Sequence, residues 1–150
     1  MQLDLSGWGE TTPNTPGKNA RFNWEEFFAW RAIEMGRPLL AMRVSDLLAT
    51  VHAQKAYKKI YVIGLKGAAV VALHAAALSD SIAGVAAIQT IPSYQDVMEH
   101  PVSQEPVSSF VPGALLNYDL PQLAEKIRPR PSLLTTEKLA ARRILEGLRC

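Results

Sequence analysis

Apolar positions along the chain follow two spacings in turn, and these predict helices and strands that alternate. Over residues 38–56 the apolar side chains recur every three or four positions, which is the spacing of a helix with one buried face. The β-branched run at 60–63 predicts a strand, and the Ala-rich segment 68–78 predicts a helix after it. Further strands are expected over 84–91 and 132–135. The alternation indicates an α/β fold, three-layer, with a short and mainly parallel sheet flanked by helices.

Other segments extend this pattern at both ends of the chain. Alternating polar and apolar residues over 2–5 predict a short strand. Asn23 is typical of a helix N-cap, and Gly36 is typical of the end of that helix. Two more helices are expected over 120–127 and 137–148.

The composition is that of an ordinary globular domain. The 150 residues suffice for a single domain with a core, and 16 basic against 14 acidic residues leave a net charge of +2. This balance argues against nucleic acid and anionic membranes as partners. No apolar run approaches the roughly 20 residues of a membrane span, and the first residues lack a signal-peptide pattern. The single cysteine, Cys150, excludes an internal disulfide, and we expect a cytoplasmic protein without metal or cofactor.

The segment Gly-Leu-Lys-Gly-Ala at residues 64–68 joins the expected strand to the expected helix. A dinucleotide site needs G-x-G-x-x-G, but the second and third glycines are replaced by Lys66 and Ala69. A P-loop is excluded because no Gly-Lys-Ser/Thr follows at the required spacing. The segment is closer to the nucleophile elbow G-x-S-x-G, in which a strained turn presents a serine. Lys66 stands at the position of that serine.

Four stretches resemble an α/β-hydrolase, and most closely its acetyl xylan esterase-like branch. Residues 4–11, Asp-Leu-Ser-Gly-Trp-Gly-Glu-Thr, are similar to the D-x-R-G-x-G-x-S loop of that branch. Residues 43–53 are similar to the helix before the elbow, and residues 64–78 to the elbow and its helix. Residues 118–131 begin Tyr-Asp-Leu-Pro and end Ile-Arg-Pro-Arg-Pro, like the approach to the seventh strand. The resemblance implies a carboxylic ester hydrolase relative that takes a small-molecule ester or sugar ester.

The chain departs from that family at the positions of its catalytic residues. The serine nucleophile is replaced by Lys66, and Glu137 is the only carboxylate near the expected place of the acid. The three histidines, His52, His74 and His100, all precede the place where the family has its histidine. The first three strands of the family fold have no counterpart. The resemblance therefore implies a single truncated domain over residues 1–150, and its unpaired sheet edges predict a homo-oligomer.

Three residues are candidates for a surviving catalytic role. At a helix N-terminus, Lys66 could act as an amine nucleophile or base, or could hold an anion with backbone N–H groups. The alternative, which we favour, is a solvated lysine on a disused elbow. Ser93 follows a strand end and would need a histidine, of which His100 is the nearest in sequence. The alternative for Ser93 is an ordinary turn residue after a proline.

Three further residues are candidates for an oxyanion or ligand site. Backbone N–H groups near Gly67, together with the loop that holds Gly7 and Trp8, could form a partial oxyanion site. Two function classes follow from these candidates. The chain is either an esterase relative with an incomplete triad and at most weak activity, or a non-catalytic relative that binds a ligand or partner in the old cleft.

Overall fold

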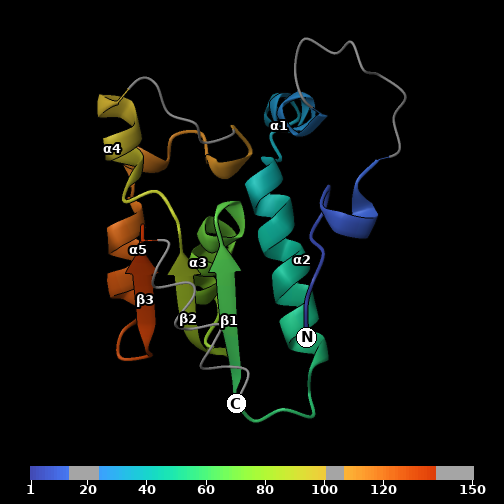
Figure 1. The fold of residues 1–150 in the computed structure, drawn as a ribbon, viewed down its shortest axis with the longest axis vertical. Coiled ribbons are helices and arrows are strands. Elements are labelled where there is room, and N and C mark those ends of the chain that lie inside the picture. The colour runs from blue at the N-terminus through green and yellow to red at the C-terminus, as the bar shows by residue number, and fades with distance from the viewer. Residues whose placement is uncertain (14–23, 101–106, 138–150) are drawn as a thin grey trace.

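The computed structural model describes residues 1–13, 24–100 and 107–137 (Figure 1). Helices and strands alternate along this part of the chain. The helices are α1 (Trp24–Glu34), α2 (Leu39–Ala53), α3 (Gly67–Leu78), α4 (Tyr94–Glu99) and α5 (Leu120–Ile127). The strands are β1 (Ile60–Leu65), β2 (Ile82–Ile88) and β3 (Ser132–Thr135). Single 3-10 turns form η1 (Gly9–Thr11), η2 (Val107–Ser109) and η3 (Ala114–Leu116).

The three strands form one parallel sheet in the order β1-β2-β3. One row across the sheet pairs Ile63 of β1 with Ala86 of β2, and Ala86 in turn with Leu133 of β3. The predicted mixed α/β class and the parallel sheet are confirmed. The second strand ends at Ile88, three residues before the predicted end at residue 91.

Helix α3 lies at the centre of the core because its side chains are small and apolar. Residues 69–77 of α3 are all buried. Alanine side chains let the helix axis approach both the sheet and its neighbours α2 and α5, which contact α3 from either side (Figure 1). The Ala-rich segment of the sequence is therefore the helix that the rest of the fold surrounds.

The two faces of the sheet differ in the described residues. Helices α3 and α5 pack on one face, where Val62 and Leu134 join the core. The opposite face carries Tyr61 and Ile63, whose exposed fractions are 61% and 39%. The expected three-layer arrangement thus appears as two layers in the part of the chain that the structure describes. Strands β1 and β3 are the outer strands, and the predicted homo-oligomer stays a prediction.

The predicted strand over residues 2–5 is wrong. These residues belong to no strand, and the carbonyl of Leu5 instead accepts hydrogen bonds from the Trp8 N–H at 2.8 Å and the Thr11 hydroxyl at 2.7 Å. Four alternating residues are too few to outweigh a following turn that satisfies the same backbone groups locally. The predicted helix 137–148 lies outside the described residues except for residue 137.

Candidate functional site

The turn between β1 and α3 holds Lys66 in a strained backbone conformation. Lys66 has φ 55° and ψ −127°, which side-chain-bearing residues rarely adopt. Its N–H donates to the carbonyl of Ile88 at 2.9 Å, and its carbonyl accepts from the Ala69 N–H at 2.8 Å. These bonds fix the turn at the carboxyl edge of the sheet, and the Lys66 side chain is exposed. Residues 64–68 are called the elbow below.

Gly64 allows the strand and the helix of the elbow to approach each other closely. A Cβ atom at residue 64 would lie 2.2 Å from the carbonyl oxygen of Ala68 and 2.7 Å from the Cα of Ala69. These are backbone atoms, so no side-chain rotation can relieve the overlap. The requirement for glycine at the first position of the elbow pattern is therefore steric.

Gly67 places the start of α3 beside the loop that holds Trp8. A Cβ atom at residue 67 would lie 3.4 Å from Cζ2 of Trp8 and 3.8 Å from the hydroxyl oxygen of Ser109. The first N–H groups of a helix have no acceptor within the helix, which here applies to Gly67 and Ala68. The elbow thus combines two backbone donors with an aromatic wall, while an oxyanion role for Gly67 and Trp8 stays a prediction.

Ser93 and His100 lie at opposite ends of α4. Ser93 is the N-cap, and its hydroxyl accepts a hydrogen bond from the Asp96 N–H at 2.9 Å. His100 follows the last turn, is 73% exposed, and pairs with the Asp96 carboxylate at 3.4 Å. The two residues are seven positions apart across the six-residue helix, which separates them by about 10 Å along the axis. The structure therefore does not bring this serine and this histidine together.

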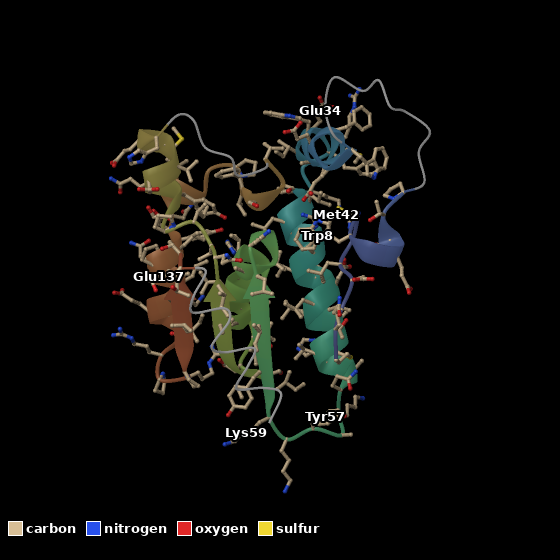
Figure 2. The ribbon with its side chains drawn as sticks, viewed as in Figure 1. Trp8, Glu34, Met42, Tyr57, Lys59 and Glu137 are labelled. Atoms are coloured by element: carbon tan, nitrogen blue, oxygen red, sulfur yellow. The ribbon has the colours of Figure 1, made fainter. Side chains whose placement is uncertain are left out.

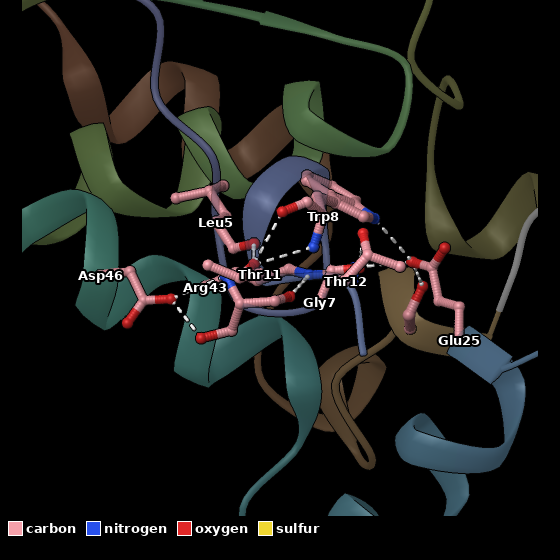
Figure 3. A network of polar contacts seen from close by, with 10 residues as sticks. Leu5, Gly7, Trp8, Thr11, Thr12, Glu25, Arg43 and Asp46 are labelled. Carbon is pink, nitrogen blue, oxygen red and sulfur yellow. Dashed lines mark hydrogen bonds and ion pairs between the residues drawn. The ribbon is translucent and has the colours of Figure 1, made fainter. Parts of the chain in front are cut away.

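A second group of polar residues, of which sequence reasoning singled out only the loop that holds Trp8, lies beside the elbow (Figure 3). The Glu25 carboxylate oxygen Oε1 accepts hydrogen bonds from Arg43 Nη1 at 2.7 Å, from the Ser108 hydroxyl at 2.6 Å and from Trp8 Nε1 at 3.3 Å. The residues come from α1, α2, η2 and the loop before η1. Ser6, Trp8, Glu25, Arg43 and Ser108 are called the Arg43 cluster below.

Arg43 is the centre of this cluster and is only 1% exposed. Its guanidinium carbon lies 3.7 Å from the centroid of the Trp8 ring, and its Nε donates to the Ser6 carbonyl at 3.0 Å. The Ser6 hydroxyl in turn donates to the Asp46 carboxylate at 2.5 Å. Arg43 Nη2 is buried and has no hydrogen-bond partner among the residues that the structure describes. Gly7 lies against this atom, since a Cβ at residue 7 would be 3.6 Å from Nη2.

The ionisation of the central pair follows from these contacts. Burial would raise the pKa of Glu25, but the hydrogen bonds from Ser108 and Arg43 and the Arg43 charge outweigh it and lower that pKa. Burial lowers the pKa of Arg43, which Glu25 and Asp46 oppose, and the ordinary value is so high that Arg43 stays charged. The cluster is therefore an ion pair at neutral pH.

His74 is a buried histidine inside α3, at the centre of the core. Its Nδ1 lies 2.8 Å from the Val70 carbonyl, which can only accept, so Nδ1 carries the proton. Its Nε2 lies 3.0 Å from the Tyr118 hydroxyl and accepts from it. Burial lowers the pKa of His74, so the ring is neutral near pH 7. Both ring nitrogens are occupied, and His74 is not free to serve as a base.

The sequence does contain one signal of the cluster. Arg43 occupies the buried face of α2 together with Leu39, Leu40, Val44 and Val51. A cation at a core position must be paired, because an isolated buried charge is costly. Its hydrogen-bond partners, Glu25 and Ser6, lie 18 and 37 positions away in the sequence and could not be identified from local spacing.

Comparisons with protein-family models, with curated proteins and with solved structures find no match. In the described ranges, no helix is both long and apolar enough to cross a membrane. Among the same residues, no group of three or more His, Cys, Asp or Glu side chains is placed to hold a metal ion.

Proposed function

We propose that the chain is an α/β-hydrolase-like relative of the carboxylic ester esterases that binds a carboxylate or ester at the elbow without turning it over. The observation that carries this proposal is Lys66, which occupies the strained turn conformation typical of a nucleophile while lacking the chemistry of a serine. Backbone strain of this kind costs about 1–3 kcal/mol, and it is concentrated at functional sites.

The elbow offers a suitable set of donors for an anionic group. The Lys66 side chain is exposed, and none of the described residues forms an ion pair with it. The N–H groups of Gly67 and Ala68 open a helix of 12 residues, whose N-terminal end attracts negative charge. The Trp8 ring borders the same position and excludes water from one side. A carboxylate would therefore meet one cation, two backbone donors and an apolar wall.

Neither His74 nor His100, as the structure describes them, offers the elbow a general base, which favours binding over hydrolysis. His74 is occupied at both nitrogens, and His100 pairs with Asp96 at the far end of α4. The Ser93 hydroxyl is held as a helix cap. A nucleophile without a base within hydrogen-bond reach gains little acceleration.

The proposal is tested by titrating acetate into the isotopically labelled protein and following backbone amide signals by NMR. We expect saturable shifts for Gly67 and Ala68 in the wild type, and their loss in Lys66→Ala. Lys59→Ala is the matched control, because Lys59 is also exposed but precedes β1 at the opposite end of the sheet (Figure 2). Shifts that persist in Lys66→Ala, or that never saturate, would contradict the proposal.

The second candidate function is weak chemistry on esters. The strained turn favours this function because the turn presents the Lys66 amine to solvent. Attack of this amine on an acetyl ester forms a C–N bond, breaks the ester C–O bond and releases the alcohol with the proton. The product is an amide, which resists hydrolysis, so the reaction stops after one acetyl group. Mass spectrometry after incubation with an activated acetyl ester would then show one added acetyl group on Lys66, absent in Lys66→Ala.

A further inference from the structure

A pocket of about 200 Å³ lies between the loop before η1 and the helices α1 and α2. One side of the pocket is apolar and includes Trp24, Phe28 and Met42. The Trp24 and Phe28 rings meet edge to face with centroids 3.9 Å apart, so they form an aromatic corner. The other side includes Gly7 and Arg43. The pocket therefore combines an apolar body with one charged, buried side chain.

Arg43 Nη2 is an unused hydrogen-bond donor beside the pocket. The Arg43 side chain is 2% exposed, and three of its atoms have clear roles: Nε bonds Ser6, Nη1 bonds Glu25, and Cζ stacks on Trp8. Among the described residues Nη2 has no partner. Almost none of its surface is open to solvent, and it lies against Gly7, which lines the same pocket. A buried donor without an acceptor is costly, and a ligand that provides the acceptor removes that cost.

The charges around the pocket favour a neutral acceptor over an anion. The Arg43 cation is already balanced by Glu25, whose Oε1 lies 2.7 Å from Nη1. A second carboxylate, Asp46, lies behind Ser6. A carboxylate placed at Nη2 would add a third negative charge to one cation, whereas a carbonyl oxygen would accept the hydrogen bond without that repulsion.

We propose that this pocket binds a small neutral molecule with a flat apolar body and one carbonyl oxygen. A small shift of Gly7 uncovers Arg43 Nη2, whose N–H donates to the carbonyl oxygen, and the flat body lies against Trp24, Phe28 and Met42. Nη2 is shielded from bulk water, so its hydrogen bond to the ligand is stronger than one at an exposed surface. The class covers aryl ketones, aryl esters and aryl amides.

This pocket is distinct from the elbow, because the Trp8 ring lies between them. The ring contacts the Arg43 guanidinium on one side, and its edge lies near the Cα of Gly67. Lys66 does not line the pocket. Binding in the pocket therefore does not depend on the function proposed for the elbow, and Lys66→Ala should leave it unchanged.

The first test compares two probes of similar shape on the wild-type protein. Acetophenone has a carbonyl oxygen, and ethylbenzene has none. We expect acetophenone to bind roughly tenfold or more tightly, which is the range for a hydrogen bond to a charged donor. NMR should place both probes at the Met42 methyl group, and acetophenone alone should shift the Gly7 amide. Equal affinities, or shifts elsewhere on the protein, would overturn the proposal. Benzoate binding more tightly than acetophenone would overturn the choice of a neutral ligand.

Two variants separate the polar anchor from the apolar body. Arg43→Lys keeps a cation for Glu25 but lacks Nη2, so the preference for acetophenone should disappear while ethylbenzene still binds. Met42→Trp fills the pocket and leaves the bonds of Arg43 in place, so both probes should lose binding together. Unchanged affinities in Met42→Trp would overturn the proposal even if Arg43→Lys fails to fold.

Discussion

The elbow and the Arg43 cluster lie next to each other and meet at the Trp8 ring, but they are built in opposite ways. The elbow is a backbone structure: its shape depends on the absence of a Cβ at Gly64 and on the strained φ of Lys66. The Arg43 cluster is a side-chain structure that joins segments far apart in the sequence. The exposed Lys66 is free to meet a ligand, whereas Arg43 is buried and mostly occupied.

Because one region is built from backbone and the other from side chains, the two make different contributions to the protein. The elbow stores strain and presents an unused cation at the edge of the sheet, which suits ligand binding. The Arg43 cluster ties the loop before η1 to α1, α2 and η2, and so holds the Trp8 wall of the elbow in place. The two regions should therefore respond differently to substitution.

The largest effect is expected for Gly64→Ala. Its Cβ would lie 2.2 Å from a backbone oxygen, so β1 and α3 must separate, and we expect a loss of more than about 3 kcal/mol in the free energy of unfolding. Gly36→Ala is the control, because Gly36 has φ 68° but no atom within 4 Å of its added Cβ. Gly36→Ala should lower the free energy of unfolding by only about 1 kcal/mol. Urea denaturation measures both, and equal costs would show that steric contact does not shape the elbow.

Arg43→Ala should have the next largest effect. It leaves the Glu25 carboxylate without its cation, and breaking a buried ion pair in this way costs about 3 kcal/mol. Arg31→Ala is the matched control: its pair with Glu34 has the same 2.7 Å separation, but the two side chains are 60% and 61% exposed. The control should change stability by less than about 0.5 kcal/mol. Similar losses in both variants would contradict the distinction between a buried cluster and a surface pair.

Lys66→Gly should stabilise the protein by about 1 kcal/mol, because glycine adopts a positive φ without strain. Lys66→Ala removes the same side chain but keeps a Cβ, so it should leave stability nearly unchanged. Thermal unfolding of the two variants compares them directly. A lower melting temperature for Lys66→Gly than for Lys66→Ala would show that the turn is not strained.

The smallest change in stability is expected when the pH is varied, because the buried His74 titrates. Its pKa is lowered from the ordinary 6.5, so the folded state binds fewer protons than the unfolded state as the pH falls below that value. Stability should be fully present above pH 6.5 and should decrease on acidification from there. His74→Gln should flatten this decrease below about pH 6.5, as followed by urea denaturation at several pH values. Identical pH profiles for the wild type and His74→Gln would contradict the assignment.

The elements and the elbow could be predicted because their determinants are local. The apolar spacing around residues 60–78 indicates a strand, a turn and a helix, and the structure has them at Ile60–Leu65 and Gly67–Leu78. Gly64 and Lys66 could be singled out from the pattern of five residues. The predicted strand over residues 2–5 was wrong, because an alternation of four residues does not indicate the hydrogen bonds of the turn that follows.

The Arg43 cluster could not be assembled from the sequence, because its members depend on how distant elements pack. Arg43 could be suspected from its place on an apolar helix face, but nothing local links it to Glu25 or Ser108. The separation of Ser93 from His100 is similar: seven positions in sequence gave no indication that a helix would hold them at opposite ends.

The most direct test of the central claim, that the elbow binds without turning over, is the release of nitrophenol from 4-nitrophenyl acetate by the wild-type chain. We expect no sustained release above the buffer rate, and we expect Lys66→Ala to give the same trace. Sustained turnover that disappears in Lys66→Ala would contradict it, because the lysine would then have replaced the serine as a working nucleophile.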